Sequence, residues 1–157
     1  MEKLLKTRKK IRISNYDYSN EGKYFITMCV QNRECILSQI KSNQIQLLEY
    51  GKITEKYIAS INNIYNDLKI THYIIMPNHV HFICELILKY RENTKRVNER
   101  IPFIISTLKR FINKECKEKI WQRNYYEHII RNEKEYLNII KYINNNPYNW
   151  KDDTYYN

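Results

Sequence analysis

The stretch 68–86 constrains the fold of this chain more than any other. Its two segments, 68–76 and 79–86, are rich in β-branched and aromatic residues, and Pro77-Asn78 stands between them. Proline and asparagine both favour tight turns. The pattern therefore predicts two antiparallel strands joined as a hairpin.

The second strand of this hairpin has two chemically different faces. Side chains two residues apart in a strand point to the same side of the sheet. Val80, Phe82 and Cys84 thus form an apolar face that suits a core beneath helices. His79 and His81 project together from the other face, where two imidazoles can hold one divalent cation. A pair of surface histidines without a ligand is the simpler interpretation of the spacing alone.

The other predicted elements are bounded by the few glycines and prolines, two and three in number. Strands are expected at 23–30 and 44–50. Apolar residues at helical spacing predict amphipathic helices at 54–67, from Pro102 onward, and from Asn132 to Pro147. Residues 87–101 lack any periodicity and predict an exposed loop.

This order of elements predicts one α+β domain that spans residues 1–157. We expect a ferredoxin-like antiparallel sheet with two helices on one face and the C-terminal helix, the expected catalytic helix, on the other. Residues 1–13 are strongly basic and form a predicted N-terminal arm.

The charge of the chain indicates a polyanionic partner. Lysine and arginine number 27 against 17 acidic residues, for a net charge of +10, which favours nucleic acid. No apolar stretch approaches the ~18 residues of a membrane span, and the charged N-terminus does not resemble a secretory signal. We therefore expect a cytoplasmic protein without a membrane partner.

The last predicted helix carries a second pair of candidate residues. Tyr142 and Asn146 are four positions apart, so both emerge on one side of the helix. If that helix crosses the free sheet face, Asn146 can complete a metal site with His79 and His81, and Tyr142 can supply a nucleophile. Alternatively, Tyr142 is one of fifteen tyrosines at a helix edge, and Asn146 only ends the helix.

Two stretches together carry a family resemblance. "MPNHVHF" and, about forty residues later, "WQRNYYEHIIRNEKEYLNIIKYINNNP" resemble the REP-associated tyrosine transposases of the HUH endonuclease superfamily. The resemblance implies that His79 and His81 bind Mg²⁺ or Mn²⁺, with Asn146 as a third ligand. It also implies that Tyr142 attacks single-stranded DNA at hairpin-forming repeats and forms a 5′-phosphotyrosine.

The implied activity is that of a DNA nuclease and strand transferase acting as a monomer or homodimer. The alternative is a catalytically inactive relative that only binds DNA or RNA hairpins. We expect contacts with DNA from the residues Lys9, Lys10, Arg12, Arg110, Lys114, Lys117, Trp121, Arg123 and Arg131. A solvated cationic face is the competing interpretation of the helix residues among them, and a core anchor that of Trp121.

Overall fold

The computed structural model describes residues 22–87 and 100–156. The predicted basic arm at 1–13, with Lys9, Lys10 and Arg12, lies outside the described residues. So do residues 88–99, which make up most of the predicted loop.

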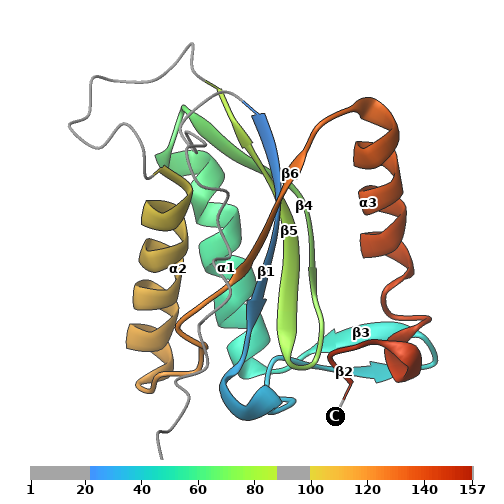
Figure 1. Cartoon of the computed structure of the whole chain (residues 1–157). Coiled ribbons are helices and arrows are strands. Elements are labelled where there is room, and N and C mark those ends of the chain that lie inside the picture. Colours follow the sequence, from blue (N-terminus) through green and yellow to red (C-terminus); the bar gives the residue numbers. More distant parts are fainter. Residues whose placement is uncertain (1–21, 88–99, 157) are drawn as a thin grey trace, which may run out of the picture.

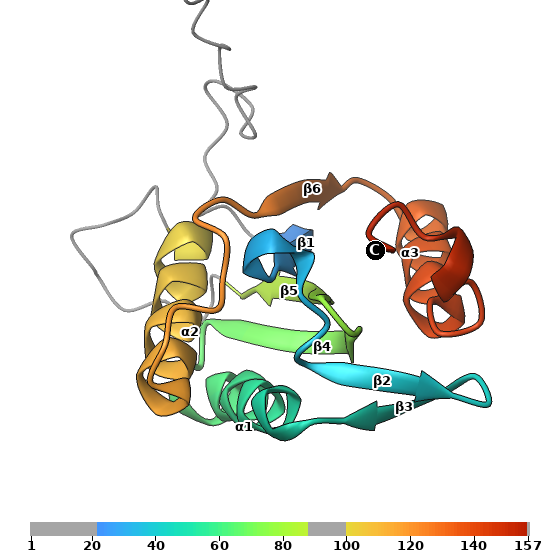
Figure 2. The same cartoon turned by 90° about the horizontal axis from the view of Figure 1, so that it is seen from below.

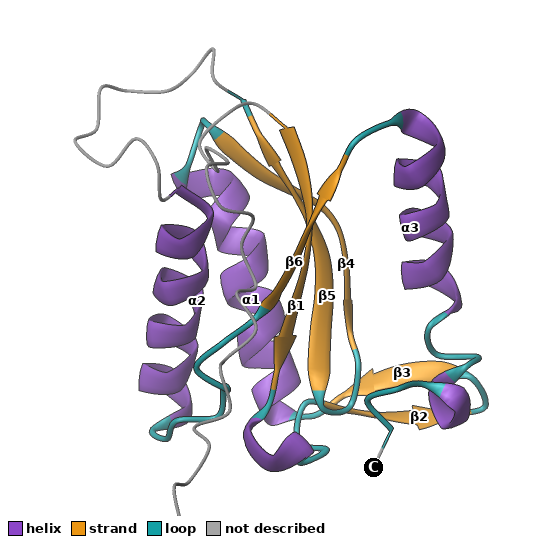
Figure 3. Cartoon of the chain, in the orientation of Figure 1, coloured by secondary structure: helices purple, strands orange, loops and turns teal. Residues whose placement is uncertain are grey.

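A four-stranded antiparallel sheet forms the centre of the domain (Figures 1 and 3). Its strands are β1 (Gly22–Cys29), β4 (Leu68–Ile75), β5 (His79–Leu86) and β6 (Tyr126–Ile130), in the spatial order β4-β5-β1-β6. With a helix between β1 and β4 and another between β5 and β6, this is the ferredoxin-like arrangement. The predicted fold class is confirmed, and β4 and β5 form the predicted hairpin.

Two strand assignments need correction. The segment predicted as a strand at 44–50 contributes only β3 (Gln44–Leu47), which pairs with β2 (Ser38–Lys41) in a separate hairpin and not with the sheet. The fourth strand of the sheet is β6, a segment that was not predicted to be a strand. It pairs with β1 alone and lies at the edge, so its five residues lack the long apolar alternation of the central strands.

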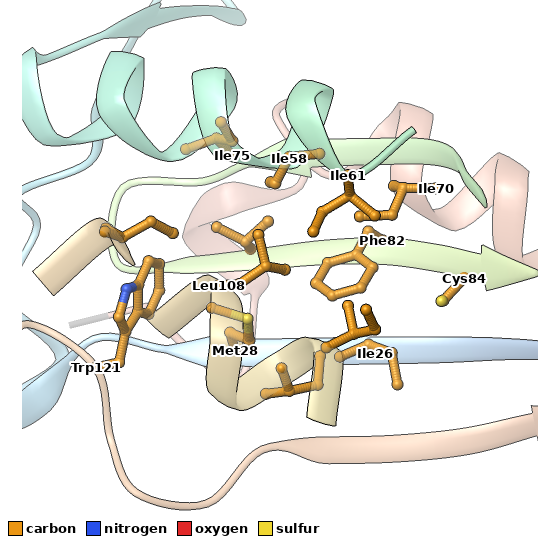
Figure 4. Close-up of a cluster of buried hydrophobic side chains, with 14 of the residues drawn as sticks. Ile26, Met28, Ile58, Ile61, Ile70, Ile75, Phe82, Cys84, Leu108 and Trp121 are labelled. Carbon is orange, nitrogen blue, oxygen red and sulfur yellow. The ribbon is translucent and has the colours of Figure 1, made fainter. Parts of the chain in front are cut away.

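Two helices cover one face of the sheet, α1 (Glu49–Ile64) and α2 (Arg100–Cys116). α1 begins five residues before the predicted start at Thr54, and Pro102 lies in the first turn of α2 as predicted. The larger core fills the space between these helices and the sheet (Figure 4). Alternate residues of β5, Val80, Phe82 and Cys84, point into it.

The third helix, α3 (Glu133–Asn145), lies alone on the opposite face of the sheet (Figures 1 and 2). The side chain of Asn132 accepts a hydrogen bond from the Glu135 backbone N–H, as the capping pattern predicts. A small second core joins α3 to the sheet, formed by Phe25, Ile83, Ile130 and Ile143. The sheet therefore has a large core on one face and a small core on the other, and His79 and His81 lie on the face with the small core.

The segment between β1 and α1 supports the turn that precedes His79. The backbone N–H of Leu37 donates to the Pro77 carbonyl at 3.0 Å, and that of Val30 donates to the Asn78 carbonyl at 2.9 Å. Gly51, in the first turn of α1, lies directly against Leu37: a Cβ atom at Gly51 would be 2.0 Å from the Leu37 carbonyl oxygen. α1 thus approaches this segment at a distance that only glycine permits.

We predict that Gly51→Ala lowers the free energy of unfolding by about 3 kcal/mol, because the backbone at Leu37 must move. Urea unfolding followed by circular dichroism measures the change. Gly22→Ala is the matched control, since its Cβ would meet only the Tyr24 ring at 3.7 Å. Equal stability of the two variants would contradict the proposed close approach.

Candidate active site

The two histidines of β5 meet at the sheet face beneath α3. Both side chains are buried, and their Nε2 atoms are 3.1 Å apart. The Nδ1 atom of His79 is 2.8 Å from the Asn78 Oδ1 atom, and the Nδ1 atom of His81 is 2.7 Å from the Thr27 hydroxyl. Each ring is therefore held by a contact at its Nδ1 atom and directs its Nε2 atom towards the other ring.

The hydrogen bonds of Asn78 determine which ring nitrogen of His79 carries the hydrogen atom. The Asn78 amide nitrogen donates to the carbonyls of Arg33 and Tyr155, so its oxygen faces His79 and accepts from Nδ1–H. The Nε2 atom of His79 then carries a lone pair, and it lies 3.1 Å from the Nε2 atom of His81. Two imidazole nitrogens so close together fit a divalent metal that is held by both rings.

Burial keeps both imidazoles neutral. It lowers the pKa of His79 to about 2, with the charges of His81 and Arg33 acting in the same direction. Burial likewise lowers the pKa of His81 to about 3. At physiological pH both rings therefore offer lone pairs to a metal and bind no extra proton.

The last turn of α3 brings Tyr142 to this pair. Its hydroxyl oxygen is 3.3 Å from the His81 Nε2 atom, and its ring packs edge-on against Phe25. The side chain is 45% exposed, so the phenol has one side towards the histidines and one towards solvent. Burial raises the pKa of Tyr142, while the nearby Asn146 amide acts in the opposite direction.

Asn146 follows α3 and is buried. Its amide nitrogen donates to the Tyr142 carbonyl at 3.4 Å, but its Oδ1 atom has no hydrogen-bond partner among the described residues. A buried amide oxygen without a partner costs free energy, and a metal ion would supply the missing interaction. Asn146 therefore remains a candidate ligand, as the sequence predicted.

The structure adds a residue that sequence reasoning missed. After α3 the chain turns back through a short 3-10 helix, Trp150–Asp152, and places Asp153 beside the histidines. One carboxylate oxygen of Asp153 and one ring nitrogen from each of His79 and His81 all lie within 4.8 Å of one another. No motif spacing marks Asp153 in the sequence, because only the return of the chain brings it there.

The chain around Asp153 is held in place from several sides. The Tyr155 ring lies 4.5 Å from that of His79, centroid to centroid, and Trp150 lies 6.0 Å away. Arg33 donates to the Thr154 carbonyl at 3.3 Å. The C-terminal segment thus forms an aromatic wall on one side of the histidine pair.

The predicted DNA contacts do not gather at one place. Arg110, Lys114 and Lys117 belong to α2 or directly follow it, on the face of the sheet opposite Tyr142. Arg131 precedes the first turn of α3, whereas Tyr142 lies in the last turn. The exposed Arg123 lies in the connection between α2 and β6.

Trp121 is corrected to a core residue. Its side chain is 3% exposed and belongs to the larger hydrophobic core, as Figure 4 shows. Base stacking needs an exposed aromatic face, which this indole does not have. The alternative interpretation of Trp121 as a core anchor is the one that the structure supports.

We predict that Asn146→Ala and Asp153→Asn each lower Mn²⁺ affinity, by about tenfold or more, because the first removes an oxygen and the second a negative charge near the two imidazoles. Isothermal titration calorimetry measures the dissociation constants. Asn144→Ala and Asp152→Asn are the controls, since both residues are exposed and Asp152 is not grouped with the histidines. Unchanged Mn²⁺ binding by His79→Ala would place the metal elsewhere.

Comparison with known proteins finds relatives in sequence. No family model matches the chain. An uncharacterized protein of Haemophilus influenzae is 36% identical, in a match that covers 95% of this chain and 93% of the relative. The REP-associated tyrosine transposase of Escherichia coli is 29% identical, over 83% of this chain and 68% of its own length.

A solved structure is similar in fold. The solved structure of a REP-associated tyrosine transposase bound to a REP hairpin superimposes with a TM-score of 0.64 and 22% identity, covering 88% of this chain and 74% of that one. No helix in the described parts of this chain is long and apolar enough to span a membrane. The chain is therefore similar in sequence to REP-associated tyrosine transposases, and it shares the fold of the solved one.

Proposed function

We propose that this chain, like the transposases it resembles, is a metal-dependent endonuclease and strand transferase that acts on single-stranded DNA at hairpin-forming repeats. The carrying observation is the position of the Tyr142 hydroxyl, 3.3 Å from the Nε2 atom of His81, which itself faces the Nε2 atom of His79. The proposed nucleophile thus comes from α3 and the proposed metal-binding histidines from β5 of the same chain. The solved relative bound to a REP hairpin supports hairpin DNA as the substrate.

The proposed first step is a displacement at phosphorus. The Tyr142 oxygen forms a bond to the scissile phosphate, and the bond to the 3′ oxygen breaks. The phenol releases its proton to solvent as the bond forms, and the departing 3′ oxygen takes up a proton from solvent. The products are a 5′-phosphotyrosine and a free 3′ hydroxyl. Attack by a 3′ hydroxyl on that linkage restores Tyr142 and joins the strand without ATP.

Several residues prepare this step. Thr27 and Asn78 hold the imidazoles in position, and the α3 backbone holds Tyr142 beside them. Mg²⁺ or Mn²⁺ bound by His79, His81 and an oxygen of Asn146 or Asp153 would supply Lewis-acid stabilisation of the charge that develops on the phosphate. Because burial raises the pKa of Tyr142, the free protein keeps its phenol protonated at neutral pH.

We predict that Tyr142→Phe abolishes covalent attachment to DNA and leaves hairpin affinity within a few-fold, because phosphate contacts provide most of the affinity. The assay incubates the protein with hairpin oligonucleotides that carry single-stranded flanks, in Mn²⁺, and detects the adduct by denaturing gel and mass spectrometry. Tyr148→Phe is the matched control, an exposed tyrosine beyond α3.

The same assay separates this proposal from an inactive hairpin-binding protein. His79→Ala and His81→Ala should lose cleavage and retain binding. A wild-type chain that binds hairpins but forms no adduct in Mg²⁺ or Mn²⁺ would favour the binding-only alternative. An adduct that persists in Tyr142→Phe would instead move the nucleophile to another tyrosine.

A further inference from the structure

A cavity of about 400 Å³ lies beside Tyr142, between the second half of α3 and the chain that follows it. Its volume is in the range of small-ligand sites. Four carboxamides contribute to its lining, together with Lys141, Tyr142 and the segment from Asp152 to Thr154. The carboxamides are those of Asn138, Asn145, Asn146 and Asn149. We call this space the amide cavity.

The described fold leaves hydrogen-bonding groups of these carboxamides available. The side chains of Asn138, Asn145 and Asn149 are exposed and form no hydrogen bond within the described chain. The Oδ1 atom of the buried Asn146 also lacks a partner there. Each carboxamide offers both a donor and an acceptor, which is the pattern of a nucleobase edge.

The order of residues along α3 places these groups on one side of the helix. Asn138, Lys141, Tyr142 and Asn145 follow the spacing i, i+3, i+4 and i+7. The half-exposed ring of Tyr142 supplies an aromatic surface beside the amides, and bases stack on such surfaces. The nucleophile and the amide cavity are therefore parts of one continuous surface.

Charge determines which part of a nucleotide would enter. Asp152 lies in the lining. Its carboxylate repels a phosphate but can accept a hydrogen bond from a base amino group. Lys141 is exposed and has no ion pair with another described residue, so it is available to a phosphate at the edge. A nucleotide would thus place its base inside and its phosphate beside Lys141 and Tyr142.

We propose that the amide cavity binds the unpaired base of the nucleotide on the 3′ side of the scissile bond. This inference rests on the proposed function, because cleavage leaves that nucleotide attached through its 5′ phosphate to Tyr142. The strand that leaves with the free 3′ hydroxyl departs on the side opposite the attacking Tyr142 oxygen. The base nearest the amide cavity is therefore the first base of the retained strand.

The test uses 5′-phosphorylated single-stranded hexanucleotides that mimic the retained strand. One set varies the 5′-terminal base, and a matched probe lacks the base at that position only. Binding is measured by fluorescence anisotropy in EDTA, where no cleavage takes place. We expect the wild-type protein to bind the best of the four bases about tenfold more tightly than the abasic probe. Removal of the 3′-terminal base should have little effect.

Variants assign this preference to the amide cavity. Asn145→Ala/Asn149→Ala should abolish the difference between base-bearing and abasic probes, whereas Asn144→Ala should retain it. Asn144 is an exposed asparagine of the same helix that does not line the amide cavity. Since the three side chains are exposed and without hydrogen-bond partners in the described chain, these substitutions leave the fold intact.

The outcomes separate this inference from the nuclease proposal. A protein that forms no DNA adduct can still show base-dependent binding in EDTA, which would support the amide cavity and not the nuclease. Wild-type protein that binds all probes equally, or binds none, would overturn the amide cavity while leaving adduct formation at Tyr142 unaffected. The same base preference in the wild-type protein and in the double variant would place the base elsewhere.

Discussion

The antiparallel register of β1 and β5 determines which face of the sheet carries the candidate chemistry. In that register Thr27 pairs with His81 and Cys29 with His79, so the Thr27 hydroxyl lies directly beside the His81 ring. A slip of one residue would turn both histidines into the large core and bring Val80 and Phe82 to the open face. The apolar residues beneath α1 and α2 therefore fix the histidines on the opposite side.

This division between faces explains why so much of the site could be predicted. The period of two in residues 79–86 and the spacing of four between Tyr142 and Asn146 are local geometry, which sequence reasoning handles well. The capping residue Asn132 and the apolar stripe of α3 are local signals too. Together they locate the candidate nucleophile and the histidine pair from the sequence alone, although their roles follow only from the family resemblance.

What could not be predicted depends on contacts between distant segments. β6 is a short edge strand whose partner, β1, lies at the other end of the described chain, and β3 finds its partner in β2 and not in the sheet. Asp153 reaches the histidines only because the chain reverses after α3. Thr27 is an ordinary strand residue until the register places it opposite His81. Trp121 has an aromatic side chain of the type that stacks on bases, and only its burial identifies it as part of the core.

The unequal size of the two cores has a consequence for the dynamics of the chain. α1 and α2 share an extensive core with the sheet, whereas α3 is joined to it by a few residues around Phe25, Ile83 and Ile143. Local opening free energies follow such differences in apolar contact. The amides of α3 should therefore exchange with solvent deuterium before those of β5, so that Tyr142 and the histidines belong to separate cooperative units of the same domain.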